Sequence, residues 1–268
     1  MQTKDQKIIF LNSYLPRTGH NFAAEVIKIF SDHQVLINPR SETKISTLLE
    51  SYFLIYENGI LNKANRDFFD HLFINDLRKR ILCKSDKNHI MIKDTSFVGV
   101  DYLPEVFPGD IHLILIRDPL NVFLSLLKAM NLNKRSYRNF LKKILLPVGI
   151  YPYFYSKKLS RQVLDHFPEL NNRIVLRYED LVMKNKTVLR KLQKIFNSES
   201  DIDEIKLKID QIKVINSSFF EETKGLKIWD MQSKTKEYDP LKRKSRNYFI
   251  RKGVELGSRQ LRKKLNYI

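Results

Sequence analysis

One segment near the N-terminus has the residue types and the spacing of an anion-binding loop. The apolar run KIIFLN (residues 7–12) is followed by SYLPRTGHNF and then by a pattern typical of a helix. A loop between a strand and a helix presents unpaired backbone N–H groups and the positive end of the helix dipole, which favour phosphate or sulfate. Arg17 adds a cation, Gly19 permits close approach of the backbone, and short polar side chains are added by Thr18 and Asn21. Taken alone, the segment is equally compatible with a plain strand-to-helix turn that requires Gly19.

A second candidate for anion binding lies in IHLILIRDPLNVFLSLLKAM, an apolar strand pattern that runs into a helix. Asp118 is suited to cap that helix, and Pro119 to occupy its first turn. Arg117 ends the strand, and Ser125 lies about two turns into the helix, where its hydroxyl could approach the same anion. Taken alone, the segment slightly favours another interpretation, in which Arg117 pairs with Asp118 and Ser125 faces solvent.

A third basic segment lies near the C-terminus and reads KRKSRNYFIRKG (residues 242–253). Taken alone, it is typical of a basic surface. The Walker A pattern is absent, which argues against an enzyme that hydrolyses ATP or GTP. The metal-site patterns H-E-x-x-H, C-x-x-C and the EF-hand loop are also absent. The motifs therefore favour anion binding by side chains and backbone, without a metal.

The elements that must position these residues alternate between short apolar strands and longer helical patterns. Apolar runs predict strands at residues 7–12, 34–37, 89–93, 111–117 and 173–178. Two helical faces are predicted, one from Phe22, Val26, Ile29 and Phe30 and the other from Val188, Leu192 and Ile195. This alternation predicts an α/β fold, with a single domain over residues 1–268 and a central, mostly parallel sheet flanked by helices. Ligands of such sheets bind beyond the carboxyl ends of the strands.

Charge and cysteine content limit the function classes. The chain has 48 Lys and Arg against 30 Asp and Glu, a net charge of +18, which favours anionic partners or serves as a solvated basic surface. Cys83 is the single cysteine, so an intrachain disulfide and a four-cysteine zinc site are excluded. Neither a signal peptide nor a membrane-spanning run is recognised, and we expect a cytoplasmic protein.

Five segments of the chain resemble motifs of the sulfotransferases that use 3′-phosphoadenosine 5′-phosphosulfate (PAPS). Their 5′-phosphosulfate loop is similar to Pro16-Arg17-Thr18-Gly19-His20-Asn21-Phe22, although the family usually has Thr or Ser where His20 and Asn21 stand. Their 3′-phosphate motif is similar to Arg-Asp-Pro at residues 117–119 with Ser eight residues after the Arg. RIVLRYEDL, NSSF (residues 216–219) and FIRKG (residues 249–253) resemble three further elements of the family. The resemblance thus extends over residues 16 to 253.

The resemblance implies a P-loop-like sulfotransferase architecture and a donor site formed by the motif residues. The 5′-phosphosulfate would be bound by Arg17, Thr18, Gly19, His20, Asn21 and Phe22. The 3′-phosphate would be bound by Arg117, Ser125, Arg251, Lys252 and the amide of Gly253 in a loop. The adenine would lie near Tyr178, Ser217, Phe219 and Phe249. The implied donor is PAPS, the implied product is adenosine 3′,5′-bisphosphate (PAP), and no metal is expected.

The catalytic residues are also assigned by resemblance. Cytosolic members of the family have a catalytic His in a K-T-H pattern, whereas this chain has Lys93-Asp94-Thr95-Ser96-Phe97, which resembles the Lys-Asp-Pro-Phe of tyrosylprotein and some carbohydrate sulfotransferases. Those enzymes carry a catalytic Glu in a Glu-Glu-Thr-Arg context, and Ser41-Glu42-Thr43-Lys44 lies at a matching distance. Glu42 is therefore the expected general base, with Lys93 and Arg17 stabilising the sulfuryl and bridging oxygens. Asp94 and His20 remain alternative bases, and Glu42 could instead be a surface carboxylate.

The acceptor is less well determined by the sequence. The segment 134–161 mixes Tyr and Phe with Lys and Arg, and it is compatible with an acceptor cleft, an anionic membrane surface or packing in the core. A hydroxyl acceptor that is anionic or a glycan fits the charge better than a neutral phenol. A kinase-like phosphotransferase and a non-catalytic nucleic-acid-binding protein are the two alternative classes. No motif for nucleic-acid binding is found, so we expect no nucleic acid as partner, and the oligomeric state is left open.

Overall fold

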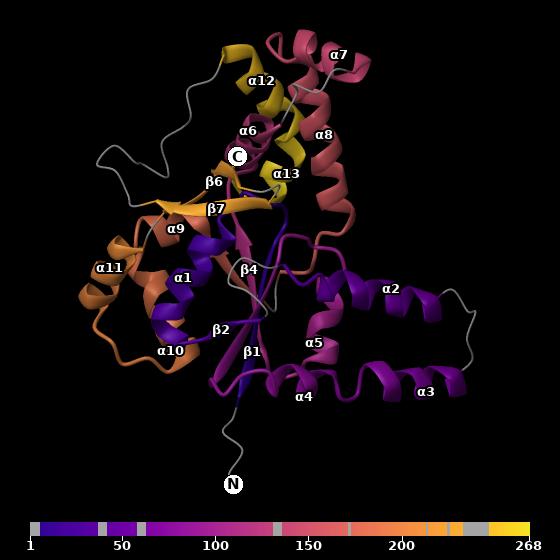
Figure 1. Cartoon of the computed structure of the whole chain (residues 1–268), viewed down its shortest axis with the longest axis vertical. Helices are drawn as coiled ribbons and strands as arrows, with labels where there is room; N and C mark the ends of the chain where they lie inside the picture. Colours follow the sequence, from indigo (N-terminus) through magenta and orange to yellow (C-terminus); the bar gives the residue numbers. More distant parts are fainter. Residues whose placement is uncertain are drawn as a thin grey trace.

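The computed structural model describes residues 6–36, 42–57, 63–130, 136–170, 173–212, 214–223, 226–232 and 247–268, and of residues 214–223 and 226–232 only the backbone. A five-stranded parallel sheet lies at the centre, in the order β2-β3-β1-β4-β5 (Figure 1). Its strands are β1 (Lys7–Ser13), β2 (Gln34–Val35), β3 (His89–Asp94), β4 (Ile111–Ile116) and β5 (Ile174–Arg177). Because all five run in one direction, their carboxyl ends meet at one edge of the sheet.

Alternate side chains of the central strands are buried on opposite faces of the sheet. On β1, Ile8 and Phe10 enter one core cluster, whereas Ile9 and Leu11 enter the other. All four side chains are at most 1% exposed. A strand buried on both faces reads as a continuous apolar run, which is why the sequence pattern identifies it.

Helices cover both faces of the sheet. The core on the face of Ile9 is completed by α1 (His20–Ser31), α9 (Tyr178–Val182), α10 (Lys186–Phe196) and α11 (Ile202–Gln211). The core on the face of Ile8 is completed by α2 (Ile45–Glu57), α4 (Leu77–Leu82), the 3-10 helix η1 (Val100–Tyr102), α5 (Leu103–Val106), α6 (Pro119–Ala129), α8 (Ile150–Asp165), α12 (Tyr248–Gly257) and α13 (Arg259–Lys264). The remaining described helices are α3 (Lys63–Phe73), beside α2, and α7 (Tyr137–Leu145), which contacts α8. The predicted fold class, a parallel sheet flanked by helices, is confirmed.

The predicted strands are confirmed to within one or two residues at each end, except that residue 37 lies outside the described residues. The predicted helical faces are less accurate. In α1 the buried apolar side chains are Ala23, Ala24, Val26, Ile27 and Phe30, and in α10 they are Leu189, Leu192 and Phe196. The predicted faces are therefore rotated by about one residue relative to the buried faces. The reason is that apolar side chains at the edge of the apolar face of a helix are only half-buried.

Two further features complete the fold. β6 (Val214–Thr223) and β7 (Leu226–Gln232) form a separate antiparallel pair, which the sequence analysis did not predict. Among the described residues, no helix is both long enough and apolar enough to cross a bilayer. The cytoplasmic location and the single domain over residues 1–268 stay predictions.

Close approach of α8 and α12 depends on Gly149, which gives the first prediction. Gly149 has a φ of +81°, and a Cβ added there would lie 2.3 Å from the carbonyl oxygen of Phe249. Gly109 has almost the same φ, +79°, but nothing lies within 4 Å of its added Cβ. Gly109→Ala therefore measures backbone strain alone, about 1–2 kcal/mol. We expect Gly149→Ala to lower the free energy of unfolding by a further 1–3 kcal/mol or so, because the helices must move apart. Urea titration of both variants measures the difference, and equal losses would contradict the close approach.

Candidate active site

The N-terminal loop joins β1 to α1 at the carboxyl edge of the sheet, as the sequence predicts. Arg17 has a φ of 74° and Gly19 a φ of 100°, so the backbone is left-handed at both positions before α1 begins at His20. No side chain caps the start of α1, so its first turn directs backbone N–H groups and the positive dipole end toward the loop. The buried hydroxyl of Thr18 donates to the carbonyl oxygen of Leu15 at 2.6 Å, which stabilises the shape of the loop.

Tyr178, the first residue of α9, links this loop to the second anion-binding segment. A Cβ added at Gly19 would lie 2.4 Å from the Tyr178 ring, so only Gly fits there. The ring of Phe22 meets Tyr178 edge-on, with the centroids 5.7 Å apart. The guanidinium carbon of Arg117 lies 4.1 Å from the centroid of the Tyr178 ring, and its Nη1 donates to the carbonyl oxygen of Arg17 at 3.2 Å. The structure thus brings together five of the residues predicted to bind the donor.

Tyr14 supports this arrangement and was missed by the sequence analysis. Its hydroxyl donates to the carbonyl oxygen of Arg117 at 2.6 Å, and its side chain is 2% exposed. Burial raises the pKa of Tyr14 well above its ordinary value, so the group remains a neutral donor. The signal available was its position directly after β1, but an aromatic residue there is equally typical of the core.

Lys93 supplies a buried cation close to the start of α1. It is the fifth residue of β3, has no exposed surface, and its Nζ donates to Oδ1 of Asn21 at 2.7 Å. Burial lowers the pKa of Lys93 to about 8, although the charges of Glu42 and Glu25 oppose the shift. At pH 7 the amine is therefore mostly charged, beside the loop that was predicted to bind the phosphosulfate.

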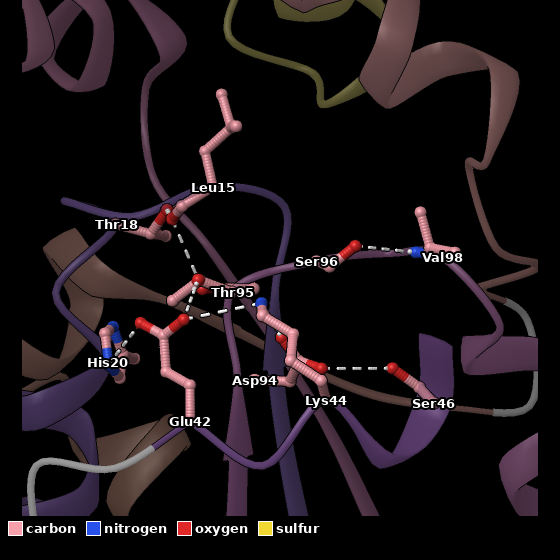
Figure 2. A network of polar contacts seen from close by, with 11 residues as sticks. Leu15, Thr18, His20, Glu42, Lys44, Ser46, Asp94, Thr95, Ser96 and Val98 are labelled. Atoms are coloured by element: carbon pink, nitrogen blue, oxygen red, sulfur yellow. Dashed lines mark hydrogen bonds and ion pairs between the residues drawn. The ribbon is translucent and has the colours of Figure 1, made fainter. Parts of the chain in front are cut away.

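Glu42 lies between groups from three separate segments, and its side chain is 29% exposed (Figure 2). Its Oε2 accepts a hydrogen bond from the Thr95 hydroxyl at 2.6 Å and lies 3.4 Å from Nζ of Lys44. Its Oε1 lies 3.7 Å from Nε2 of His20. One oxygen of the Glu42 carboxylate is thus held by Thr95 and Lys44. The other is directed toward His20, at the end of the loop between β1 and α1, which we call the donor loop. Thr95 and Lys44 were not assigned any role from the sequence.

His20, one of the alternative bases, is nearly buried in this cluster. Burial, assisted by the positive charge of Lys93, lowers its pKa to about 4, against the attraction of Glu42. The ring is therefore neutral at pH 7. A base this weak is a poorer proton acceptor near neutrality than an ordinary imidazole.

Asp94, the other alternative base, is occupied by neighbouring residues. Its Oδ1 accepts from Nζ of Lys44 at 2.6 Å, and its Oδ2 accepts from the Ser46 hydroxyl at 3.3 Å. Its side chain is 3% exposed. An ion-paired and buried carboxylate is suited to positioning Lys44, which in turn lies beside Glu42.

The predicted 3′-phosphate residues come from two neighbouring parts of the fold, the β4–α6 segment and α12. Arg117 directly follows β4, and the half-buried Ser125 lies in α6, the next helix. Asp118 caps this helix by accepting from the backbone N–H of Leu120 at 3.0 Å, as predicted. Asp118 also forms an ion pair, in which its Oδ1 lies 2.9 Å from Nε of Arg262.

The C-terminal motif differs from its prediction. Phe249–Gly253 was expected to form a loop, but it lies in α12, which begins at Tyr248. The amide of Gly253 is therefore too far inside the helix to be one of its unpaired N–H groups. Lys252 is paired with Glu255 at 3.6 Å, one turn further along. Contact of Arg251, Lys252 and Phe249 with a donor stays a prediction. The side chains of Ser217 and Phe219 in β6 lie outside the described residues.

The described part of the chain places no group of three or more His, Cys, Asp or Glu side chains where they could hold a metal ion.

Comparison with known proteins gives structural matches only. Neither a family model nor a curated protein sequence matches the chain. The sulfotransferase domain of the Synechococcus PCC 7002 olefin synthase matches with 14% identity and a TM-score of 0.45, over 100% of this chain and 98% of that one. Mouse sulfotransferase SULT7A1 complexed with PAP matches with 18% identity and a TM-score of 0.38, over 76% of this chain and 62% of that one.

A retinol dehydratase complexed with androsterone and inactive cofactor PAP matches with 15% identity and a TM-score of 0.34, over 76% of this chain. The match spans 63% of the length of that enzyme. At these identities and TM-scores the likeness carries no argument about activity. The case for a function therefore depends on the motifs and on the geometry described above.

Proposed function

We propose that the chain transfers a sulfuryl group from PAPS to a hydroxyl of an acceptor. The observation that carries the proposal is the convergence of Gly19, Arg117 and Tyr178, which come from three separate motifs of the family and meet in one contact cluster. Lys93 and Glu42, the residues expected to do chemistry, lie beside the same loop. The sheet order makes β1, β4 and β5 neighbours, and the residues that meet where these three strands end are those of the family motifs.

The residues of this cluster fit an anionic nucleotide. Arg17, Lys93 and Arg117 supply cations, and the uncapped start of α1 supplies backbone donors and a positive dipole end. The flat ring of Tyr178, which carries Arg117 on one side, is suited to lie near a base. In the proposal Arg17 and Asn21 contact the 5′ side of PAPS, and Arg117 with Ser125 contacts its 3′-phosphate.

PAPS supplies an activated sulfuryl group, and the chain supplies charge and a proton acceptor. The acceptor oxygen forms a bond to sulfur while the bond from sulfur to the bridging phosphate oxygen breaks, and PAP is the leaving group. Lys93 and Arg17 stabilise the charge that develops on the bridging and sulfuryl oxygens. Glu42 takes the acceptor proton on Oε1, because Thr95 and Lys44 engage Oε2. Side chains thus perform the charge neutralisation, so no metal is part of the proposal.

The positive charge of the site and of the whole chain indicates the class of acceptor. The site contains more cations than the carboxylates of Glu42 and Asp94 balance, and the whole chain carries +18. A hydroxyl on an anionic molecule or a glycan fits such a field. The experiment that tests the function is a PAP-release assay with PAPS and a panel of anionic, glycan and phenolic hydroxyl acceptors. Sulfated product is expected with at least one anionic or glycan acceptor, and transfer from ATP instead of PAPS would support the kinase-like alternative.

The charge of Lys93 predicts an alkaline limit of activity. Because burial lowers the pKa of Lys93 to about 8, the free enzyme loses this cation as the pH rises through that value. We therefore expect kcat/KM, which reports ionisations of the free enzyme, to fall above pH 8 or so. Lys93→Arg keeps the charge at all accessible pH values. The substitution should therefore remove the fall of kcat/KM above pH 8, even if it lowers the rate itself. An unchanged fall in the Lys93→Arg variant would assign the ionisation to another group.

A further inference from the structure

The helix α7 has an apolar face that no residue of the described part of the chain buries. Tyr137, Phe140, Leu141 and Ile144 recur at i, i+3, i+4 and i+7, the spacing of one helical face. Their exposed fractions are 76, 60, 38 and 51%. None of the nine residues of α7 is buried. An amphipathic helix this short gains most of its stability from packing, so the exposed face is suited to a partner outside the chain.

The same end of the molecule exposes further apolar side chains. Val148, between α7 and α8, is 54% exposed, and Phe154 in α8 is 61% exposed. Figure 1 shows α7 with the beginnings of α8 and α12 at the end of the molecule toward which the strands run. The close approach of Gly149 and Phe249 joins these two beginnings. We call the exposed apolar residues of α7, with Val148 and Phe154, the α7 patch.

The segment that carries the α7 patch has charges of one sign. Residues 136–161 contain six basic side chains and no acidic one: Arg138, Lys142, Lys143, Lys157, Lys158 and Arg161. Two of the lysines lie against tyrosine rings, with Nζ of Lys142 5.7 Å from the Tyr151 centroid and Nζ of Lys157 5.3 Å from the Tyr153 centroid. The exposed aromatic and aliphatic side chains of the patch therefore lie on a segment whose charged side chains are all cationic.

We propose that the α7 patch docks on the surface of an anionic lipid bilayer. Helices with Phe and Leu on one face and Lys and Arg beside it lie in the plane of the membrane interface, where the apolar face enters and the cations meet anionic headgroups. A second copy of the chain would place six cations against six others, in molecules that each carry +18, so self-association is disfavoured. The inference depends on the surface of the fold and not on the proposed activity.

Vesicle flotation of the full chain tests the proposal directly. The chain should float with phosphatidylcholine vesicles that contain about 30% phosphatidylserine and much less with pure phosphatidylcholine, and added salt should weaken the binding. The double variant Phe140→Asp with Ile144→Asp should lower the partition coefficient by at least about tenfold, because the apolar face no longer enters the interface. Arg138→Glu with Lys143→Glu should do the same through charge. All four side chains are exposed or at the surface of α7, so folding should be retained.

A matched control is Leu207→Asp, in which an apolar side chain of α11 that is 63% exposed receives the same charge. Its flotation should equal that of the unaltered chain. Equal binding to neutral and anionic vesicles, or equal losses in Leu207→Asp and in the α7 variants, would overturn the proposal. So would no flotation at all, or a dimer in sedimentation analysis that Phe140→Asp dissociates, since the face would then be covered by a second copy.

Discussion

Glu42→Gln should lower kcat by about 10²–10⁴-fold and leave the affinity for PAP almost unchanged. The substitution keeps the shape of the side chain and its contact with Thr95, which donates to Oε2 at 2.6 Å. It removes the proton acceptor at Oε1, the oxygen directed toward His20 and the donor loop. The measurement is steady-state PAP release for kcat, with calorimetric titration of PAP for affinity.

The control is Glu105→Gln, at an exposed carboxylate in α5, which should retain full activity. The two alternative bases give the contradicting outcome. If Glu42→Gln turns over at nearly the normal rate, while a folded His20→Gln or Asp94→Asn variant is inactive, the base is misassigned. Asp94→Asn is expected to have the smaller effect on kcat, because Asp94 is paired with Lys44 at 2.6 Å and acts by positioning it.

Arg117→Ala should weaken PAP binding by roughly 2–3 kcal/mol, about 30- to 150-fold in Kd. Its guanidinium is the cation that the resemblance places on the 3′-phosphate, and it also stacks on Tyr178 and donates to the carbonyl oxygen of Arg17. Loss of the side chain removes a charge-assisted hydrogen bond and loosens the loop. Binding should therefore suffer first, the reverse of the pattern expected for Glu42→Gln.

Arg80→Ala serves as the control, because Arg80 is an exposed arginine on α4 and its loss changes the net charge equally. It should bind PAP normally. Thermal unfolding of Arg117→Ala must show a folded protein, and Arg117→Lys, which keeps the charge, should recover part of the affinity. An unaltered Kd in a folded Arg117→Ala variant would remove Arg117 from the donor site.

The central strands β1, β3 and β4 could be predicted because they are buried on both faces of the sheet. KIIFLN and HIMIK contain the uninterrupted apolar runs IIFL and IMI, so they differ from the amphipathic patterns between them. The start of α1 was also predictable, since Gly19 follows a strand and precedes a helical period. Which residues of that helix are buried was predicted less well, because the spacing of apolar residues locates the buried face only to within about one residue.

The C-terminal region was predicted least well. FIRKG was expected to be a loop because it resembles a loop motif of the sulfotransferases, yet α12 incorporates Gly253 as a point of close approach to the start of α8. Only the tertiary contact with Gly149 explains a glycine inside that helix. The β6–β7 pair was missed because its strands lack a long apolar run.

The cluster around Glu42 shows what sequence spacing leaves out. Glu42 itself was chosen from its distance to the donor loop, and it does lie beside that loop. Its partners Thr95 and Lys44 come from elements whose relative positions are set by the sheet, since Thr95 directly follows β3 and Lys44 precedes α2. No local sequence pattern predicts a hydrogen bond between residues 42 and 95, so these positioning residues could be identified only from the three-dimensional structure.

The most direct test of the account is calorimetric titration with PAP and with adenosine 5′-phosphate, which needs no acceptor. Arg117 and its neighbours were assigned to a nucleotide that carries a phosphate on the ribose 3′ position. We expect PAP to bind more tightly by roughly 2–4 kcal/mol, about 30- to 1000-fold, because charge-assisted hydrogen bonds hold the second phosphate. Equal affinities for the two nucleotides, or a preference for ATP over PAP, would contradict the assignment of this site to PAPS.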